Sequence, residues 1–128
     1  MNPKTLYRPV ADRLGIAASG VCAVHCALAP LALAFLPGGL ARVFSSPLVH
    51  HGLAVFVAVS SLLAFVPGWL KHGESRIWGW ALSGLACVLA ARFEAEGSAE
   101  IVLTFLGSVL LIIAHRLNHS LSYWCGKD

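Results

Sequence analysis

Charged side chains are scarce in this sequence: Asp, Glu, Lys and Arg make up only 12% of its 128 residues. Soluble domains carry about a quarter, so the composition excludes an ordinary water-soluble domain. Hydrophobic residues account for 58% of the chain, and the mean hydropathy is +0.77. The sequence therefore predicts a protein that lies mainly in a lipid bilayer.

Motifs for several other functions are also missing. The chain has no glycine-rich phosphate loop, no strong internal repeat, no low-complexity stretch and no nucleic-acid-binding motif. Its net charge of +3 is small, and the basic residues are spread between apolar segments, where they act as topological signals. We expect no nucleic-acid partner, no catalytic residues and no resident cofactor, and we predict that the protein is not an enzyme.

Cysteines are few, and their positions argue against a disulfide framework. Of the four, Cys22, Cys26 and Cys87 fall within apolar runs and only Cys125 lies in a polar tail. Residues one helical turn apart have Cβ atoms about 5–6 Å apart, whereas a disulfide needs about 3.8 Å. We therefore expect Cys22 and Cys26 to be free thiols.

Four apolar segments cover most of the chain, at about residues 14–36, 48–70, 77–92 and 98–116. Crossing a bilayer takes about 20 such residues. The first segment is too long for the core of a cleaved signal peptide, and the last two are short for a crossing. Those two must borrow flanking residues or thin the bilayer, or else form a hairpin that dips into it. We predict an all-α membrane protein with one domain over residues 1–128, an antiparallel bundle of four transmembrane helices.

The basic residues predict the orientation of this bundle. Cytoplasmic loops carry the excess of Lys and Arg. With four crossings, Arg42 and Arg92 fall on one side of the membrane. The other side holds the N-terminus, the second loop and the C-terminus, with Lys4, Arg8, Arg13, Lys71, Arg76, Arg116 and Lys127. We therefore expect both termini in the cytoplasm.

The first segment carries a candidate metal site at its centre. Cys22, His25 and Cys26 are three and four residues apart, so they share one helical face. Ionisable groups at that depth are costly and indicate function by default. Thiolates select soft metals and imidazole suits zinc and copper, so Hg, Zn and Cu are all candidate ions.

The other polar residues form levels along the predicted bundle. Ser60 and Ser61 lie level with the thiols in the middle of the membrane. The remaining candidate metal ligands are His50, His51 and Glu100 near the outer surface, and Asp12, His72, His115 and His119 near the cytoplasmic one. His115 and His119 are one turn apart and could form a second site. Whether these levels make a path or one cluster stays open at this point.

Two motifs resemble those of the MerC family, membrane proteins associated with bacterial mercury resistance. The opening motif is Asp12…Gly15…Ser19…Cys22…His25-Cys26…Pro30, and the closing motif is Glu100…Thr104…Gly107…His115…Asn118. The resemblance covers about residues 12–118. It implies a multi-pass protein of the bacterial inner membrane that takes up Hg(II) and delivers it inward, with the cysteines of the first helix as ligands. The chain departs from the mercury transporters at its C-terminus, where Cys125 stands alone instead of in a second pair.

The sequence is compatible with three classes of function. The leading hypothesis is a carrier that captures a soft metal ion and passes it inward by exchange between thiol and imidazole ligands. The alternatives are a metal- or haem-binding redox protein and a membrane enzyme with a His/Asp/Glu metal centre. The expected partners are the metal ion and the lipid bilayer. A cytoplasmic metal acceptor and a second copy of the chain are left open.

Overall fold

The computed structural model describes residues 3–125 and, within them, the side chains of residues 10–29 and 34–125. The described residues form helices and no strand. This confirms the predicted all-α fold with four long helices; a short fifth helix, α2, is additional. The helices are α1 (Pro3–Phe35), α2 (Gly38–Phe44), α3 (Pro47–His72), α4 (Arg76–Phe93) and α5 (Ser98–Trp124).

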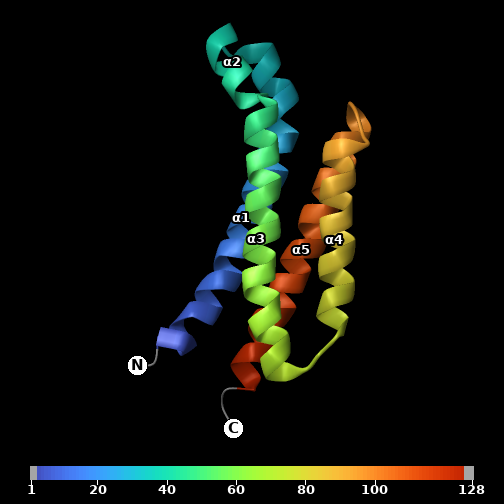
Figure 1. The fold of residues 1–128 in the computed structure, drawn as a ribbon. Coiled ribbons are helices and arrows are strands. Elements are labelled where there is room, and N and C mark those ends of the chain that lie inside the picture. The colour runs from blue at the N-terminus through green and yellow to red at the C-terminus, as the bar shows by residue number, and fades with distance from the viewer. Residues whose placement is uncertain (1–2, 126–128) are drawn as a thin grey trace.

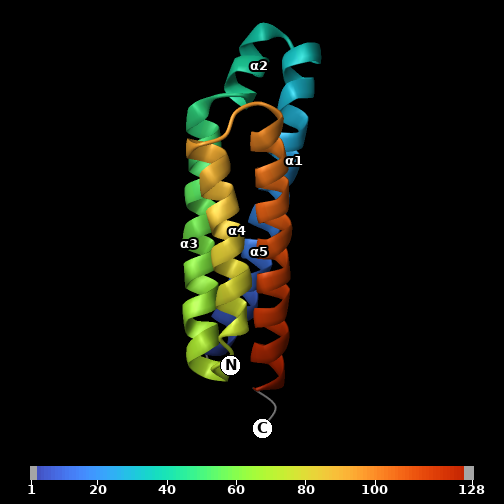
Figure 2. The ribbon, with the colours of Figure 1, turned by 90° about the vertical axis from the view of Figure 1, so that its right-hand side faces the viewer.

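The four long helices run side by side, and α2 lies at one end of the bundle (Figures 1 and 2). Both ends of the described chain lie at the opposite end, together with the turn between α3 and α4. These two ends are named the α2 end and the termini end below. The placement of both termini on one side agrees with four antiparallel crossings, whereas their cytoplasmic location stays a prediction.

Three stretches are long and apolar enough to cross a membrane: Val10–Ala29, Gly38–His72 and Ser98–Trp124. Helix α4 is not among them because Arg76 and Arg92 fall in its first and last turns. Large apolar side chains point away from the bundle, as Val24 and Val102 show with exposed fractions of 58% and 63%. The interior is instead rich in small and polar side chains, which is the pattern expected for a protein surrounded by lipid.

Helices α1 and α5 are longer than the predicted apolar segments. Helix α1 begins at Pro3 instead of near residue 14, and α5 continues to Trp124 instead of ending near residue 116. Hydropathy marks only the part of a helix that can lie in lipid, while backbone hydrogen bonding continues through polar residues beyond it. The extension of α5 matters for the site because it carries Asn118.

The short helix α2 follows the first predicted apolar segment directly. Helix α1 ends at Phe35, close to the predicted end of the first segment. Gly38 then starts α2, and Pro37 is the residue before its first turn. This short helix places Phe44 against α1, where its ring contacts His25.

Helices α4 and α5 approach closely through glycine. A Cβ atom added to Gly107 would lie 2.7 Å from the backbone oxygen of Gly84, and one added to Gly84 would lie 2.9 Å from the oxygen of Gly107. Only glycine at both positions allows this spacing, as small residues do generally between membrane helices. The contact holds α4 against α5 and so positions Arg92 and Val88 toward the interior.

Candidate metal centre

Helices α1 and α5 pair along one antiparallel line, which we call the α1–α5 seam. Near the termini end, Asp12 meets Asn118 and Gly15 lies against His115. Further along, Ser108 lies beside Cys22 and Thr104 beside Cys26. In each of these pairs the two residue numbers add to 130. The seam therefore brings small and polar residues of the first and last long helices face to face.

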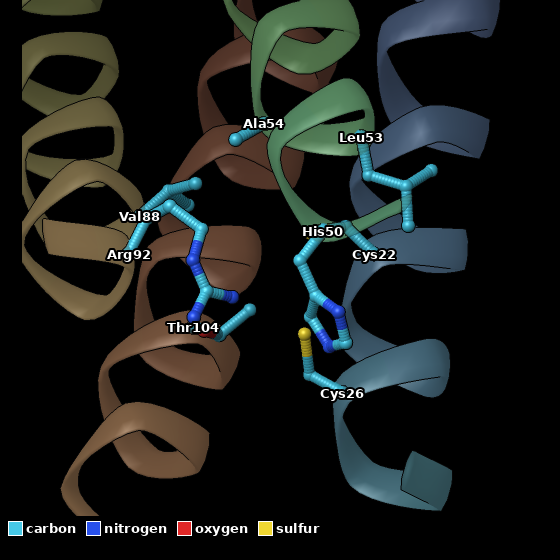
Figure 3. Close-up of a pocket in the computed structure, with 8 residues that line it drawn as sticks. All are labelled: Cys22, Cys26, His50, Leu53, Ala54, Val88, Arg92 and Thr104. Carbon is cyan, nitrogen blue, oxygen red and sulfur yellow. The ribbon is translucent and has the colours of Figure 1, made fainter. Parts of the chain in front are cut away.

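The thiols of α1 lie in a small pocket on this seam. Cys22 and Cys26 are 4% and 8% exposed, contact each other and are not in a disulfide. Figure 3 shows Cys26 and His50 next to each other, with Arg92 and Thr104 across the pocket. The cavity has a volume of about 10 Å³, close to the smallest space that holds one water molecule. It can accept one small ion or water. The lining residues are Cys22, Cys26, His50, Leu53, Ala54, Val88, Arg92 and Thr104.

His50 is oriented as a metal-binding histidine usually is. Its Nδ1–H donates to the backbone oxygen of Ser46 at 3.1 Å, so its Nε2 carries a free lone pair. Ligating histidines commonly donate their other ring N–H to a backbone carbonyl in this way. The hydrogen bond fixes the tautomer and leaves Nε2 available to accept a proton or a metal.

A wider hollow adjoins the thiol pocket on the side of the α2 end. Cys26, His50 and Arg92 line both spaces, and the hollow has a volume of about 480 Å³. Glu100 lines it too, and its Oε1 lies 2.7 Å from Nη1 of Arg92. Both side chains are largely buried, at 25% and 19% exposed, so the pair places two opposite charges at the entrance to the thiols.

His25 lies beside this pocket without lining it. Its ring packs on Phe44 with centroids 4.3 Å apart and meets the edge of His50 at 4.8 Å. Among the described residues its Nε2 has no hydrogen-bond partner although it is buried. The imidazole therefore keeps one free nitrogen near His50.

Two buried hydroxyl groups continue the seam from the thiols toward the termini end. Ser19 and Ser108 are each 1% exposed; Oγ of Ser19 makes no hydrogen bond within the described part of the chain, and Oγ of Ser108 lies beside the thiol of Cys22. Buried polar atoms are normally satisfied, so each such group calls for a reason. Ser19 is three residues before Cys22 on α1, so both hydroxyls lie next to the thiols.

A second polar cluster lies at the termini end of the α1–α5 seam. The carboxylate of Asp12 accepts from Nδ1 of His115 at 3.1 Å and from Nδ2 of Asn118 at 2.9 Å. These three side chains are at most 1% exposed. A Cβ atom on Gly15 would fall within the His115 ring, and one on Gly68 would overlap the Asn118 amide. The two glycines make room for the cluster, which we call the Asp12 network.

Helix α3 supplies the rest of the Asp12 network. His72 accepts the N–H of Glu74 at its Nδ1, so its Nε2–H donates to Oδ1 of Asn118 at 3.0 Å. The Asn118 amide also donates to the backbone oxygen of Ala64 at 3.2 Å. Ser61 Oγ lies 3.4 Å from Nε2 of His115. The network thus joins α1, α3 and α5 in the interior.

The structure divides the predicted metal ligands into separate groups. Cys22, Cys26 and His50 share the thiol pocket, with Glu100 in the hollow next to it. Asp12, His72 and His115 belong to the Asp12 network. No set of three or more His, Cys, Asp or Glu side chains within the described residues is arranged to hold a metal ion.

Several predicted positions lie outside both groups. The ring of His51 hydrogen-bonds the backbone oxygen of Pro47 and contacts Phe93. His119 lines a separate hollow and does not join the Asp12 network, to which His115 belongs. Ser61, expected level with the thiols, instead contacts His115. The side chain of Pro30 lies outside the described side chains.

Sequence reasoning missed Arg92 and did not choose Thr104 as part of the site. Arg92 was counted only as a loop charge, although it ends an apolar segment just before Glu94, Glu96 and Glu100. Burying the charge of an arginine is costly unless a carboxylate pairs with it. Glu100 supplies that carboxylate for Arg92. Thr104 stands in the closing motif, and the antiparallel pairing of α1 with α5 is what places it beside Cys26.

Comparisons with known proteins identify the family. A family model described as MerC mercury resistance protein matches residues 12–120. The match includes the whole α1–α5 seam and the thiol pocket. No curated protein and no solved structure matches the chain.

Proposed function

Because the chain belongs to the MerC family of mercury-resistance membrane proteins, we propose that it is a carrier that takes up Hg(II) through the thiol pocket. One observation supports this most: two free thiols and an oriented imidazole surround a cavity for a single ion. Thiolates are the ligands that select soft metals. Neither the redox nor the enzymatic alternative has support from the comparisons.

The ion enters from the α2 end in this proposal. The hollow of about 480 Å³ offers the carboxylate of Glu100 and the imidazole of His50 before the thiols. The carboxylate of Glu100 is already paired with Arg92, so the imidazole of His50, a borderline ligand, is the group that first binds the ion. Cys26 lines both the hollow and the pocket, so it is the first thiol that the ion meets, and Cys22 is the second.

Binding at the two thiols produces a neutral complex. Hg²⁺ forms one bond to each sulfur while each thiol loses its proton, so two protons leave and the charges cancel. The free Nε2 of His50 is placed to accept a proton from Cys26. A neutral complex avoids the large cost of burying a charge in a low-dielectric interior. This explains how a doubly charged ion can be held inside the bundle.

Delivery proceeds along the seam toward the termini end. The hydroxyls of Ser19 and Ser108 lie on this route, and the Asp12 network closes it. With the predicted orientation, the route runs inward across the bacterial inner membrane to a thiol-bearing acceptor in the cytoplasm. Tight binding of Hg(II) by that acceptor would supply the driving force.

The carrier proposal is tested by uptake of radioactive Hg(II) into vesicles that contain the purified protein and a trapped dithiol. We expect uptake well above that of protein-free vesicles of the same lipid. Equal uptake by the two preparations would refute transport. Tight binding of Hg(II) without uptake would reduce the function to metal binding.

Replacing His50 with alanine is expected to slow the loading of Hg(II) onto the thiols. The change removes the only imidazole that lines both the hollow and the pocket, and loss of such a supporting group typically costs roughly 10–100-fold in metal affinity or activity. Stopped-flow measurement of the ultraviolet absorption of the Hg–thiolate bond reports the rate. His51→Ala is the matched control, because that ring is exposed and faces Phe93. An identical rate in both variants would exclude a role for His50.

A further inference from the structure

A second hollow lies between α1 and α5 at the termini end and is separate from the thiol pocket. Its volume is about 390 Å³. Five of its six lining residues carry hydrogen-bond donors, and two of these are arginines. The lining residues are Arg13, Ile16, Arg116, His119, Ser120 and Tyr123. We call this space the basic hollow.

Among the described residues, no acid is paired with the arginines of the basic hollow. Both Arg13 and Arg116 are exposed. Asp12 is the acid nearest to Arg13 in the chain, and its carboxylate is engaged inside the bundle by His115 and Asn118. Two guanidinium groups in one hollow match a phosphate, which they bind through paired hydrogen bonds.

The surface next to the basic hollow is apolar. On α1, Ala17 and Gly20 follow Arg13 at helical spacing, and on α5 Ile113 and Val109 lie on the face of Arg116. Ala17 and Val109 are exposed, and a Cβ atom added to Gly20 would meet nothing within 4 Å. A shallow apolar strip therefore runs from the hollow toward the middle of the bundle. Free phosphate has no use for such a strip, but the acyl chain of a lipid does.

We propose that the basic hollow binds the phosphate headgroup of an anionic phospholipid, with an acyl chain along the strip between α1 and α5. Basic pockets between membrane helices are known to take such headgroups. None of the residues involved belongs to the thiol pocket or the Asp12 network, so the proposal is independent of mercury transport. The bound lipid would bridge α1 and α5 at the end of the seam where the cargo leaves.

The test compares lipid binding to the full-length protein in detergent, measured by native mass spectrometry with phosphatidylglycerol and with phosphatidylcholine. We expect the wild type to prefer phosphatidylglycerol. Arg13→Gln and Arg116→Gln should each weaken that binding roughly fivefold, which corresponds to about 1 kcal/mol for a basic side chain near an anionic surface. The double variant should show no preference. Arg76→Gln is the control, because Arg76 lies at the same end but is 86% exposed and beside Glu74.

Three results would overturn the proposal. The first is an unchanged preference for phosphatidylglycerol in the double variant. The second is an equal loss in Arg76→Gln, which would indicate general attraction to the basic end instead of a site. The third is displacement of phosphatidylglycerol by inorganic phosphate at equal concentration, which would identify a free anion as the ligand. Circular dichroism of each variant checks that the helices are retained.

Discussion

Replacing both Cys22 and Cys26 with serine is expected to lower Hg(II) uptake to the level of vesicles without protein. Serine keeps the size of each side chain and removes the soft sulfur ligand, so the bundle should fold while the ion loses both of its bonds. Because the thiols are the only soft ligands among the described residues that line the pocket, none of those residues can replace them. Each single variant should retain weak binding through the remaining sulfur and transport far more slowly than the wild type.

The chain offers two matched controls for this experiment. Cys87 is half-buried on α4 and Cys125 is exposed beyond α5, and neither lines the thiol pocket. The Cys87→Ser/Cys125→Ser variant loses the same number of thiols and should transport at the wild-type rate. It should also bind one Hg(II) per chain, whereas the Cys22→Ser/Cys26→Ser variant should bind none in the presence of a competing monothiol. Full uptake by the latter variant would refute the carrier mechanism.

The bilayer made the helices predictable from the sequence. Segments in lipid must satisfy every backbone polar group internally, so apolar runs of sufficient length become helices. The same reasoning could not find where each helix ends, because the extension of α5 beyond residue 116 is polar and depends on packing. Asn118, which joins three helices, lies in that extension.

Only part of the candidate site could be predicted for a related reason. Spacing within one helix showed that Cys22 and Cys26 share a face, but contacts between helices depend on how each helix is rotated. His50 and His51 illustrate the limit. Successive residues point about 100° apart on a helix, so only one imidazole can face the thiols, and the sequence does not say which. The rotation of α3 turns His50 inward and leaves His51 against Phe93.

The sequence left open whether the polar residues form a continuous path or one cluster. The structure places them in two separate clusters. Two clusters lie on the α1–α5 seam, one built on thiols and one on Asp12, with Ser19 and Ser108 between the two in sequence along the paired helices. The separation follows from the antiparallel pairing, which matches Cys22 and Cys26 with hydroxyl-bearing residues of α5 and matches Asp12 with an amide. Soft ligands are therefore kept apart from the charged and strongly hydrogen-bonded ones.

Replacing Asp12 with leucine is expected to destabilise the folded bundle by about 3–5 kcal/mol, the usual cost of removing one partner from a buried polar pair. The substitution leaves Nδ1 of His115 without an acceptor and removes two of the three acceptor oxygens of the Asn118 amide. Both side chains are at most 1% exposed, so water cannot compensate. Unfolding in mixed micelles, followed by circular dichroism, measures the change in the free energy of unfolding.

Two companion variants separate the Asp12 network from a general effect of adding leucine. Glu96→Leu removes an exposed carboxylate and should change the free energy of unfolding by no more than about 0.5 kcal/mol. Asp12→Leu/Asn118→Leu removes the donor together with its acceptor, so it should cost less than the sum of the two single changes. Simple additivity in this cycle, or wild-type stability of Asp12→Leu, would show that the carboxylate does not hold α1 to α5. A cost in the double variant that is smaller than the sum of the two single costs would show that the Asp12 network stabilises the contact between α1 and α5.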